Sequence, residues 1–208
     1  MLTKIYAAAL QGIEAQIVTI EVNCTQGIQF FMVGLPDAAV KESHQRIISA
    51  LSHNSLKFPR RKVVVNLAPA DIKKEGSAYD LPIAIGLLAA NEEFKSDRFK
   101  DFLIMGELSL DGSILPIKGA LPIAIMAKEQ GYKGFILPKE NASEAAVIDG
   151  LKVYGVENIT EVVNFPERPE MIVQGPCSVS KVVLTLCLWN NLQEMWNSNN
   201  INNSNDNS

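Results

Sequence analysis

The sequence predicts an α+β (mixed α/β) fold for residues 1–165, followed by a tail of different composition at residues 166–208. Three observations support this fold class. Runs rich in β-branched residues with rough period-two alternation fill the start of the chain, an amphipathic helical pattern follows, and short apolar runs then alternate with helical stretches. A chain of 208 residues is long enough to bury a substantial core in one such domain.

Three strands are expected at the start of the chain. Their sequences are TKIYAAAL at 3–10, IEAQIVTIEV at 13–22 and GIQFFMVG at 27–34, with turns at Gln11-Gly12 and at residues 25–27. Short turns between consecutive strands favour antiparallel neighbours. The sequence therefore predicts an N-terminal antiparallel meander.

One amphipathic helix and one buried strand come next. Residues 34–55 carry apolar side chains on one helical face and charged side chains on the opposite face. The apolar positions of this helix are Ala39, Val40, Ile47, Ile48 and Leu51. After it, the β-branched run KVVVNLA at 62–68 predicts a buried strand that Pro69 ends.

The second half of the chain predicts an alternation of strands and helices. Asp111-Gly112 is typical of a tight hairpin turn, so two short strands are expected around it. Helices are expected at 79–91, 119–130, 140–150 and 157–165, and strands at 134–138 and 151–156.

The composition limits the functions that the chain can have. Hydrophobic residues make up 47% of it and charged residues 20%, as in a soluble folded protein, and a net charge of -4 gives no overall attraction to nucleic acid or acidic membranes. The three cysteines (Cys24, Cys177 and Cys187) show no CxxC spacing, which indicates neither a disulfide framework nor a zinc site. No apolar run reaches the about 18 residues of a membrane span, and the N-terminus lacks a signal-peptide pattern. We expect a cytoplasmic protein.

The tail differs from the domain before it. Nine of the nineteen residues from 190 to 208 are asparagine, and such a segment has too little apolar content to offset the entropy of ordering. Residues 166–208 are therefore expected to be a degenerate or truncated tail that is disordered from about residue 190.

Three segments together resemble a known family: GLPDAAVKES at 34–43, VVVNLAPADIKKEGSAYDLPIAIGLLAA at 63–90 and GELSLDGSILPIKGALPIAIMAKEQGYKGFILP at 106–138. They are similar to the N-terminal domain of the YifB/ComM family of magnesium-chelatase-like AAA+ ATPases, over residues 1–165. The resemblance implies a two-layer fold like that of the Lon proteolytic domain, of the ribosomal-protein-type domain 2 class, and like the C-terminal domain of RadA. It also implies that the whole protein is a hexameric ATP-driven DNA motor linked to branch migration in natural transformation.

Ser77, in KKEGSAYDLPIAIG, is a candidate nucleophile or a helix N-cap. Lon-type proteases pair a serine with a lysine, since a desolvated lysine can accept the serine's proton. Laid on that pattern, this sequence has Ala78 at the nucleophile position and Leu121 at the lysine position, with Ser77 one residue early and Lys118 three residues early. The resemblance therefore implies no catalytic residues, and Ser77–Lys118 stays as a rival dyad. The preferred interpretation makes Ser77 the cap of the helix at 79–91, with Asp80 favourably placed at its positive end.

A second catalytic motif is also incomplete. GPCSVSKV at 175–182 places Gly175 and Lys181 as in a Walker A loop, but Ser180 replaces the second glycine and Val182 replaces the magnesium-binding Ser or Thr. We expect no ATP or magnesium bound to this chain, since both belong to the full-length family's ATPase module.

The remaining candidates are charged residues. A basic rim that contacts DNA phosphates is one interpretation of six residues, and a solvated strand edge protected by charge is the other: Lys57, Arg60, Arg61, Lys62, Lys73 and Lys74. His44 and His53 are expected to be solvated helix residues rather than metal ligands, and Asp37 a partner of the helix N-terminus.

These observations favour a non-catalytic accessory domain of a ComM-type protein that lacks the ATPase module. Its expected partners are DNA and further copies within a hexamer, without a membrane. The alternatives are a stand-alone DNA-binding module and an active Ser/Lys peptidase.

Overall fold

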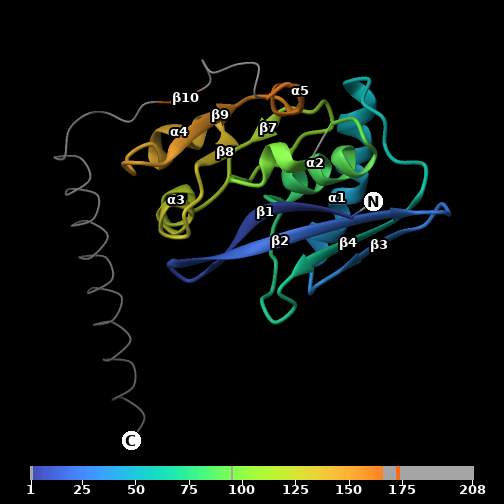
Figure 1. Ribbon diagram of the computed structural model, residues 1–208, viewed down its shortest axis with the longest axis horizontal. Helices are drawn as coiled ribbons and strands as arrows, with labels where there is room; N and C mark the ends of the chain where they lie inside the picture. Colours follow the sequence, from blue (N-terminus) through green and yellow to red (C-terminus); the bar gives the residue numbers. More distant parts are fainter. Residues whose placement is uncertain (1, 95, 166–171, 174–208) are drawn as a thin grey trace, which may run out of the picture. The chain divides into compact units, whose positions relative to one another are not determined.

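A mixed β-sheet organises the part of the chain that the structure describes (Figure 1). The computed structural model describes residues 2–94, 96–165 and 172–173, all within one compact unit, Met1–Gly175. Its strands, in the spatial order of the sheet, are β10 (Ile172–Val173), β9 (Lys152–Val156), β8 (Gly134–Pro138), β5 (Phe102–Ile104), β1 (Leu2–Gln11), β2 (Glu14–Thr25), β4 (Lys62–Ala68) and β3 (Phe30–Val33).

The first two strands form the hairpin that the sequence predicts, but the third strand lies elsewhere. β1 and β2 pair antiparallel from Leu2↔Asn23 to Gln11↔Glu14. β4 pairs antiparallel with β2 and parallel with β3, so it separates these two strands. The predicted meander is therefore wrong in its third strand. The physical reason is that helix α1 (Ala38–His53) connects β3 to β4, and a helical crossover allows parallel pairing.

The second half of the chain adds parallel strands to the other side of β1. β5 pairs with β1, β8 with β5 and β9 with β8, all in parallel. Helices α3 (Ala120–Glu129) and α4 (Lys139–Ala145) lie along the chain between these strands, and α5 (Ile159–Val163) follows β9. The hairpin expected at Asp111-Gly112 is confirmed as β6 (Glu107–Leu108) and β7 (Ile114–Leu115). The mixed α/β class is confirmed, and β10 extends the sheet past the expected domain end at residue 165.

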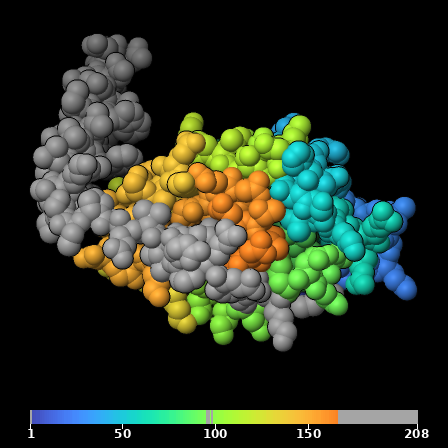
Figure 2. Space-filling view, turned by 90° about the horizontal axis from the view of Figure 1, so that it is seen from above, coloured from blue at the N-terminus to red at the C-terminus, as the bar shows by residue number. Residues whose placement is uncertain are grey.

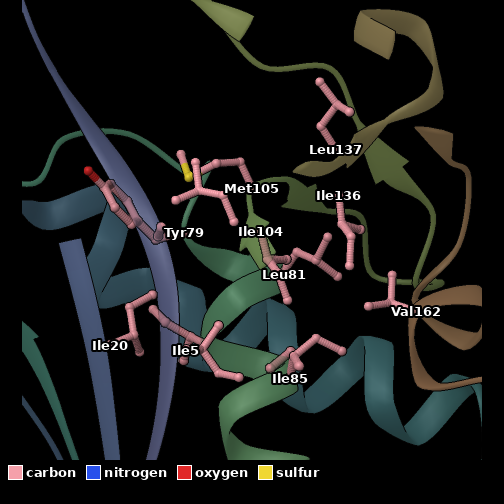
Figure 3. Packing of buried hydrophobic residues seen from close by; sticks show 14 of the residues in the cluster. Ile5, Ile20, Tyr79, Leu81, Ile85, Ile104, Met105, Ile136, Leu137 and Val162 are labelled. Atoms are coloured by element: carbon pink, nitrogen blue, oxygen red, sulfur yellow. The ribbon is translucent and has the colours of Figure 1, made fainter. Parts of the chain in front are cut away.

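Helix α2 (Asp80–Ala90) is the centre of the core, and all of its residues are buried. It packs on β1, on β2 and against α1, which explains its almost wholly apolar sequence. Figure 3 shows Leu81 and Ile85 of this helix near Ile5 and Ile20 of the sheet. Gly86 is the point of closest approach to the sheet. A Cβ atom at this position would lie 2.8 Å from Cγ2 of Val22 and 3.5 Å from Cγ1 of Ile5, so only glycine lets the helix approach this closely.

The end of α1 is tied to the last helix through the β6–β7 turn. The Asn54 side chain donates one hydrogen bond to the Ala50 carbonyl and another to the Asp111 carbonyl, both of 2.8 Å. The Ile159 N–H donates to the Gly112 carbonyl at 3.0 Å. These bonds bring residues far apart in the sequence side by side on the face shown in Figure 2, where the cyan α1 region adjoins the orange residues of the α5 region.

His44 lies between aromatic rings, although the sequence predicts a solvated residue. Its imidazole stacks on Phe30 at 4.0 Å between ring centroids and meets Phe58 edge-on at 5.4 Å. Because β3 packs under α1, this face of the helix is half-buried. Burial lowers the pKa of His44 from its ordinary value of 6.5.

The aromatic contacts of His44 predict a loss of stability at acidic pH. Because the folded-state pKa is lower than the unfolded-state pKa, the unfolded chain binds the extra proton more readily. The contribution of the neutral imidazole is complete above pH 6.5 and is lost as the pH falls toward the folded-state pKa. Urea denaturation between pH 5 and pH 8 should therefore show a free energy of unfolding that decreases below about pH 6.5.

The variant His44→Phe should remove this part of the pH dependence, since it keeps the ring stack without a titrating group. His53→Gln, at the exposed end of the same helix, is the matched control and should leave the pH dependence in place. An unchanged pH profile in His44→Phe would contradict the assignment.

Candidate functional site

A candidate site is the pocket of about 610 Å³ beside the end of β1. Three segments form most of its wall: residues 8–10 of β1, residues 75–79 before α2, and residues 116–118 before α3. Met105, Ile123 and the alanines of β1 give it an apolar floor, while charged side chains stand around them. The pocket therefore combines an apolar surface with polar groups, as ligand sites usually do.

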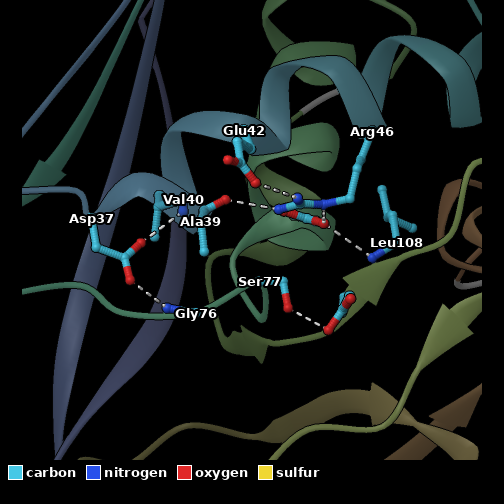
Figure 4. A network of polar contacts seen from close by, with 10 residues as sticks. Asp37, Ala39, Val40, Glu42, Arg46, Gly76, Ser77 and Leu108 are labelled. Atoms are coloured by element: carbon cyan, nitrogen blue, oxygen red, sulfur yellow. Dashed lines mark hydrogen bonds and ion pairs between the residues drawn. The ribbon is translucent and has the colours of Figure 1, made fainter.

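Asp37 fixes the loop that forms one side of the pocket. Its Oδ1 accepts a hydrogen bond of 2.8 Å from the Val40 N–H, so the residue is the N-cap of α1, as expected for a helix-terminal carboxylate. Its Oδ2 accepts a bond of 3.1 Å from the Gly76 N–H (Figure 4). One carboxylate thus joins the start of α1 to the loop that carries Ser77.

Ser77 is not the cap of α2, so this prediction is wrong. The helix begins at Asp80, Tyr79 precedes it, and no side chain caps its first turn. The Ser77 hydroxyl instead donates a hydrogen bond to the Glu107 carboxylate, across the pocket loop (Figure 4). The physical reason is Gly106, just before β6, whose carbonyl accepts from the Leu81 N–H at 3.0 Å and takes the place of a side-chain cap.

Lys118 lines the same pocket, so the fold brings the two members of the rival dyad to one site. Lys118 is exposed, and its ammonium has no hydrogen bond or ion pair with any residue in the described part of the chain. The Ser77 hydroxyl is already engaged with a carboxylate. Tyr79 adds a buried phenol to the wall, and burial raises the pKa of its hydroxyl, which therefore stays protonated.

Asp80, which is buried, and Arg46, which is partly exposed, form an ion pair next to this pocket. Arg46 Nε donates to Oδ2 of Asp80 at 2.6 Å and Nη2 donates to Oδ1 at 2.9 Å, a bidentate arrangement (Figure 4). The same Nη2 donates to the Ala39 carbonyl at 2.8 Å, and the Leu108 N–H donates to the carboxylate at 3.3 Å. Asp80 is fully buried. Burial raises its pKa, and the hydrogen bonds from Arg46 oppose this.

The sequence indicates that Asp80 lies near the positive end of the helix dipole, but it gives no sign of the residue's partner. The signal was an aspartate at the start of an otherwise apolar helix, where a buried charge requires a cation. Arg46 is 34 positions earlier, on the face of α1 that carries other charged residues, so the sequence pattern gives no reason to select it.

The basic residues divide into two groups, one just before and at the start of β4 and one between β4 and α2. Lys57, Arg60 and Arg61 are exposed in the segment between α1 and β4, and the Lys62 ammonium lies 5.5 Å from the ring centroid of Phe31. Lys73 forms an ion pair with Glu75.

Lys74 cannot belong to a basic rim, so that expectation is wrong for this residue. Its side chain is fully buried and its ammonium donates to the Pro69 carbonyl. The backbone pairing of Lys74 with Pro36 directs the side chain inward, and burial lowers its pKa.

Other expectations concern residues that the structure leaves undescribed. Gly175 and Lys181 of the degenerate phosphate loop lie outside the described residues, as does the asparagine-rich tail. Within residues 2–94, 96–165 and 172–173, no group of three or more His, Cys, Asp or Glu side chains is placed to hold a metal ion. None of the helices in the same residues has the length and apolar character needed to cross a bilayer.

Comparison with known proteins identifies the family of the chain. The family described as "Subunit ChlI of Mg-chelatase" matches residues 20–141, which include Ser77, Asp80, Glu107 and Lys118. The chain belongs to this magnesium-chelatase-like family. Competence protein ComM of Haemophilus influenzae is 40% identical over 172 residues, which cover 82% of this chain and 34% of that protein.

Two further relatives extend the comparison. Escherichia coli YifB, described as an uncharacterized protein, is 39% identical over 150 residues, covering 72% of this chain and 29% of that protein. Lon protease 2 of Bacillus subtilis is 28% identical over 137 residues, covering 65% of this chain and 23% of the protease. The chain spans about a third of the length of the ComM and YifB relatives that it matches.

The buried ion pair predicts a large effect of Arg46→Met on stability. This change leaves the Asp80 carboxylate buried without its cation, and breaking a buried pair in this way costs about 3–5 kcal/mol. Urea denaturation at pH 7 should show this loss. The double variant Arg46→Met with Asp80→Leu should lose less stability than Arg46→Met alone, since neither charge then remains.

Glu42→Gln provides the matched control, because Glu42 contacts the same guanidinium at 3.9 Å from an exposed position. Glu42→Gln should change the free energy of unfolding by no more than about 0.5 kcal/mol. If Arg46→Met changed the free energy of unfolding no more than Glu42→Gln does, the ion pair between Arg46 and Asp80 would not stabilise the fold.

Proposed function

We propose that this chain is a non-catalytic accessory domain of a ComM-type magnesium-chelatase-like protein that takes part in DNA processing in the cytoplasm. The family assignment supports the type of protein, and the name of the Haemophilus relative, a competence protein, supports the link to DNA. The observation that carries the non-catalytic role is the hydrogen bond from the Ser77 hydroxyl to the Glu107 carboxylate.

A serine hydroxyl becomes a nucleophile only when a sufficiently strong base accepts its proton. The partner of Ser77 is a carboxylate, and carboxylates are much weaker bases than amines. A lysine acts as such a base near neutral pH only when burial removes it from water, and Lys118 is exposed. The similarity to a Lon protease therefore supports a shared scaffold without supporting a shared reaction.

ATP and magnesium binding, and assembly into a hexamer, belong in this proposal to the remainder of the full-length relatives. This chain spans only 34% of ComM. Within a ring, it would support assembly or contact DNA beside the motor.

A fluorophosphonate probe and a labelled casein substrate test the non-catalytic role. We expect neither labelling nor hydrolysis above the buffer control, because Ser77 lacks a competent base. An active Lon-type protease serves as the positive control, and Ser113→Ala as the matched serine control. Labelling that disappears in both Ser77→Ala and Lys118→Ala would overturn the proposal in favour of a Ser/Lys peptidase.

A second candidate function is stand-alone DNA binding through the exposed basic segment. Lys57, Arg60 and Arg61 are all exposed, and none has an acidic partner among the described residues. Cations that are free of acidic neighbours can exchange counterions for phosphates, which gives salt-dependent affinity. The segment lies between α1 and β4 with these three side chains exposed, so DNA could reach them without disturbing the core.

Fluorescence anisotropy with single-stranded and branched DNA tests this function. If the segment contacts phosphates, Arg60→Glu with Arg61→Glu should weaken binding at least tenfold and lower the salt slope by roughly two. The matched control, Lys128→Glu with Lys152→Glu, changes the net charge equally at exposed positions elsewhere. Absence of binding at low salt would remove this function.

A further inference from the structure

The second half of β1 has an open backbone edge. β2 pairs with β1 along its whole length. On the opposite side, β5 pairs with β1 only at Tyr6↔Leu103. No other described strand pairs with residues 7–11 on that side, because β5 ends at Ile104.

The hydrogen bond of Ala8 shows which backbone groups face this edge. The Ala8 N–H donates to the Met105 sulfur at 3.3 Å, so it points away from β2. A thioether is a weak acceptor and is no substitute for a carbonyl. Because alternate residues of a strand direct their backbone groups to the same side, the N–H and C=O of Leu10 also point away from β2. Unpaired groups of this kind form a template for another strand.

This edge forms one wall of the pocket of about 610 Å³. Such a volume lies within the range of about 300–1,000 Å³ that ligand sites occupy. Ile117 and Ile123 give the pocket apolar surface for side chains. Lys118 also lines the pocket. Among the charged lining residues it alone has no partner in the described part of the chain, since Asp37, Glu75, Glu107 and Lys73 are all engaged.

We propose that the pocket binds an extended peptide segment of a partner protein, which adds a strand to β1 and places an acidic side chain on Lys118. An extended peptide has the same repeat as a strand, about 3.3 Å per residue. Every second residue of the peptide can therefore pair its N–H and C=O groups with those of Ala8 and Leu10. A carboxylate on the peptide would complement the unpaired ammonium. The peptide is held without being cleaved, because Ser77 bonds to Glu107. This inference uses none of the residues of the basic segment, so it stands independently of DNA binding.

A phage-displayed library of random dodecapeptides, selected on the full 208-residue chain, provides the test. Synthetic copies of the enriched peptides should bind with micromolar dissociation constants and contain acidic residues. Leu10→Pro should weaken binding at least tenfold, since proline lacks the outward N–H. It should still fold, because proline is tolerated where a strand's N–H faces away from its partner. Lys118→Glu should also weaken binding, whereas Lys128→Glu, exposed and outside the pocket lining, should not.

A second measurement does not depend on the folding of any variant. N-methylation of alternate peptide amides should abolish binding, and N-methylation of the intervening amides should preserve it, because only every second amide faces β1. Failure to enrich any peptide, equal binding by Leu10→Pro, or absence of this period-two pattern would overturn the proposal. Sedimentation that shows a wild-type dimer and a Leu10→Pro monomer would also overturn it, since the edge would then pair with a second copy.

Mass spectrometry of the bound peptide separates this inference from the proposed function. Recovery of an intact peptide agrees with both. Cleavage would support peptide binding at this pocket and would overturn the non-catalytic role.

Discussion

The ion pair between Asp80 and Arg46 holds together the parts from which the site is built. Asp80 is the first residue of α2, Arg46 belongs to α1, and the Leu108 N–H of β6 donates to the same carboxylate. Desolvating two charges is costly, and this arrangement offsets much of that cost because the carboxylate is bidentate to the guanidinium and receives a further backbone bond. The start of α2 is thereby fixed in position, and with it the loop at 75–79 that forms one side of the pocket.

The pocket brings together segments that are distant in the sequence. The fold that the chain shares with Lon proteases places residues 77–79 and 116–118 around one cavity. In this chain an alanine and an exposed lysine occupy the critical segments, and the neighbouring serine is bonded to Glu107. Catalysis by a serine and a lysine depends on the direction of both side chains. Relative to the Lon-type pattern, Ser77 lies one residue early and Lys118 three residues early, beside the cavity and the open strand edge.

Much of the fold could be predicted from local patterns, and the errors share a physical cause. Helical periodicity located α1, the apolar run located α2, and Asp111-Gly112 located the β6–β7 turn. Alternation identified β3 as a strand, but alternation carries no information about the neighbouring strand, so its pairing with β4 was missed.

Polar residues gave corresponding errors. His44 and Lys74 were expected at the surface because their side chains are polar, yet tertiary packing buries Lys74 fully and His44 in part. Asp80 could be located, but its partner Arg46 could not, since contacts between distant segments leave no local periodicity.

The position of β4 between β2 and β3 also bears on how the chain is made. A ribosome completes β3 at Val33 and starts β4 only at Lys62, so the outer edge of β2 emerges without its neighbour. The long separation between these partners slows native pairing, and the nascent hairpin must be kept from other chains until α1 and β4 have emerged.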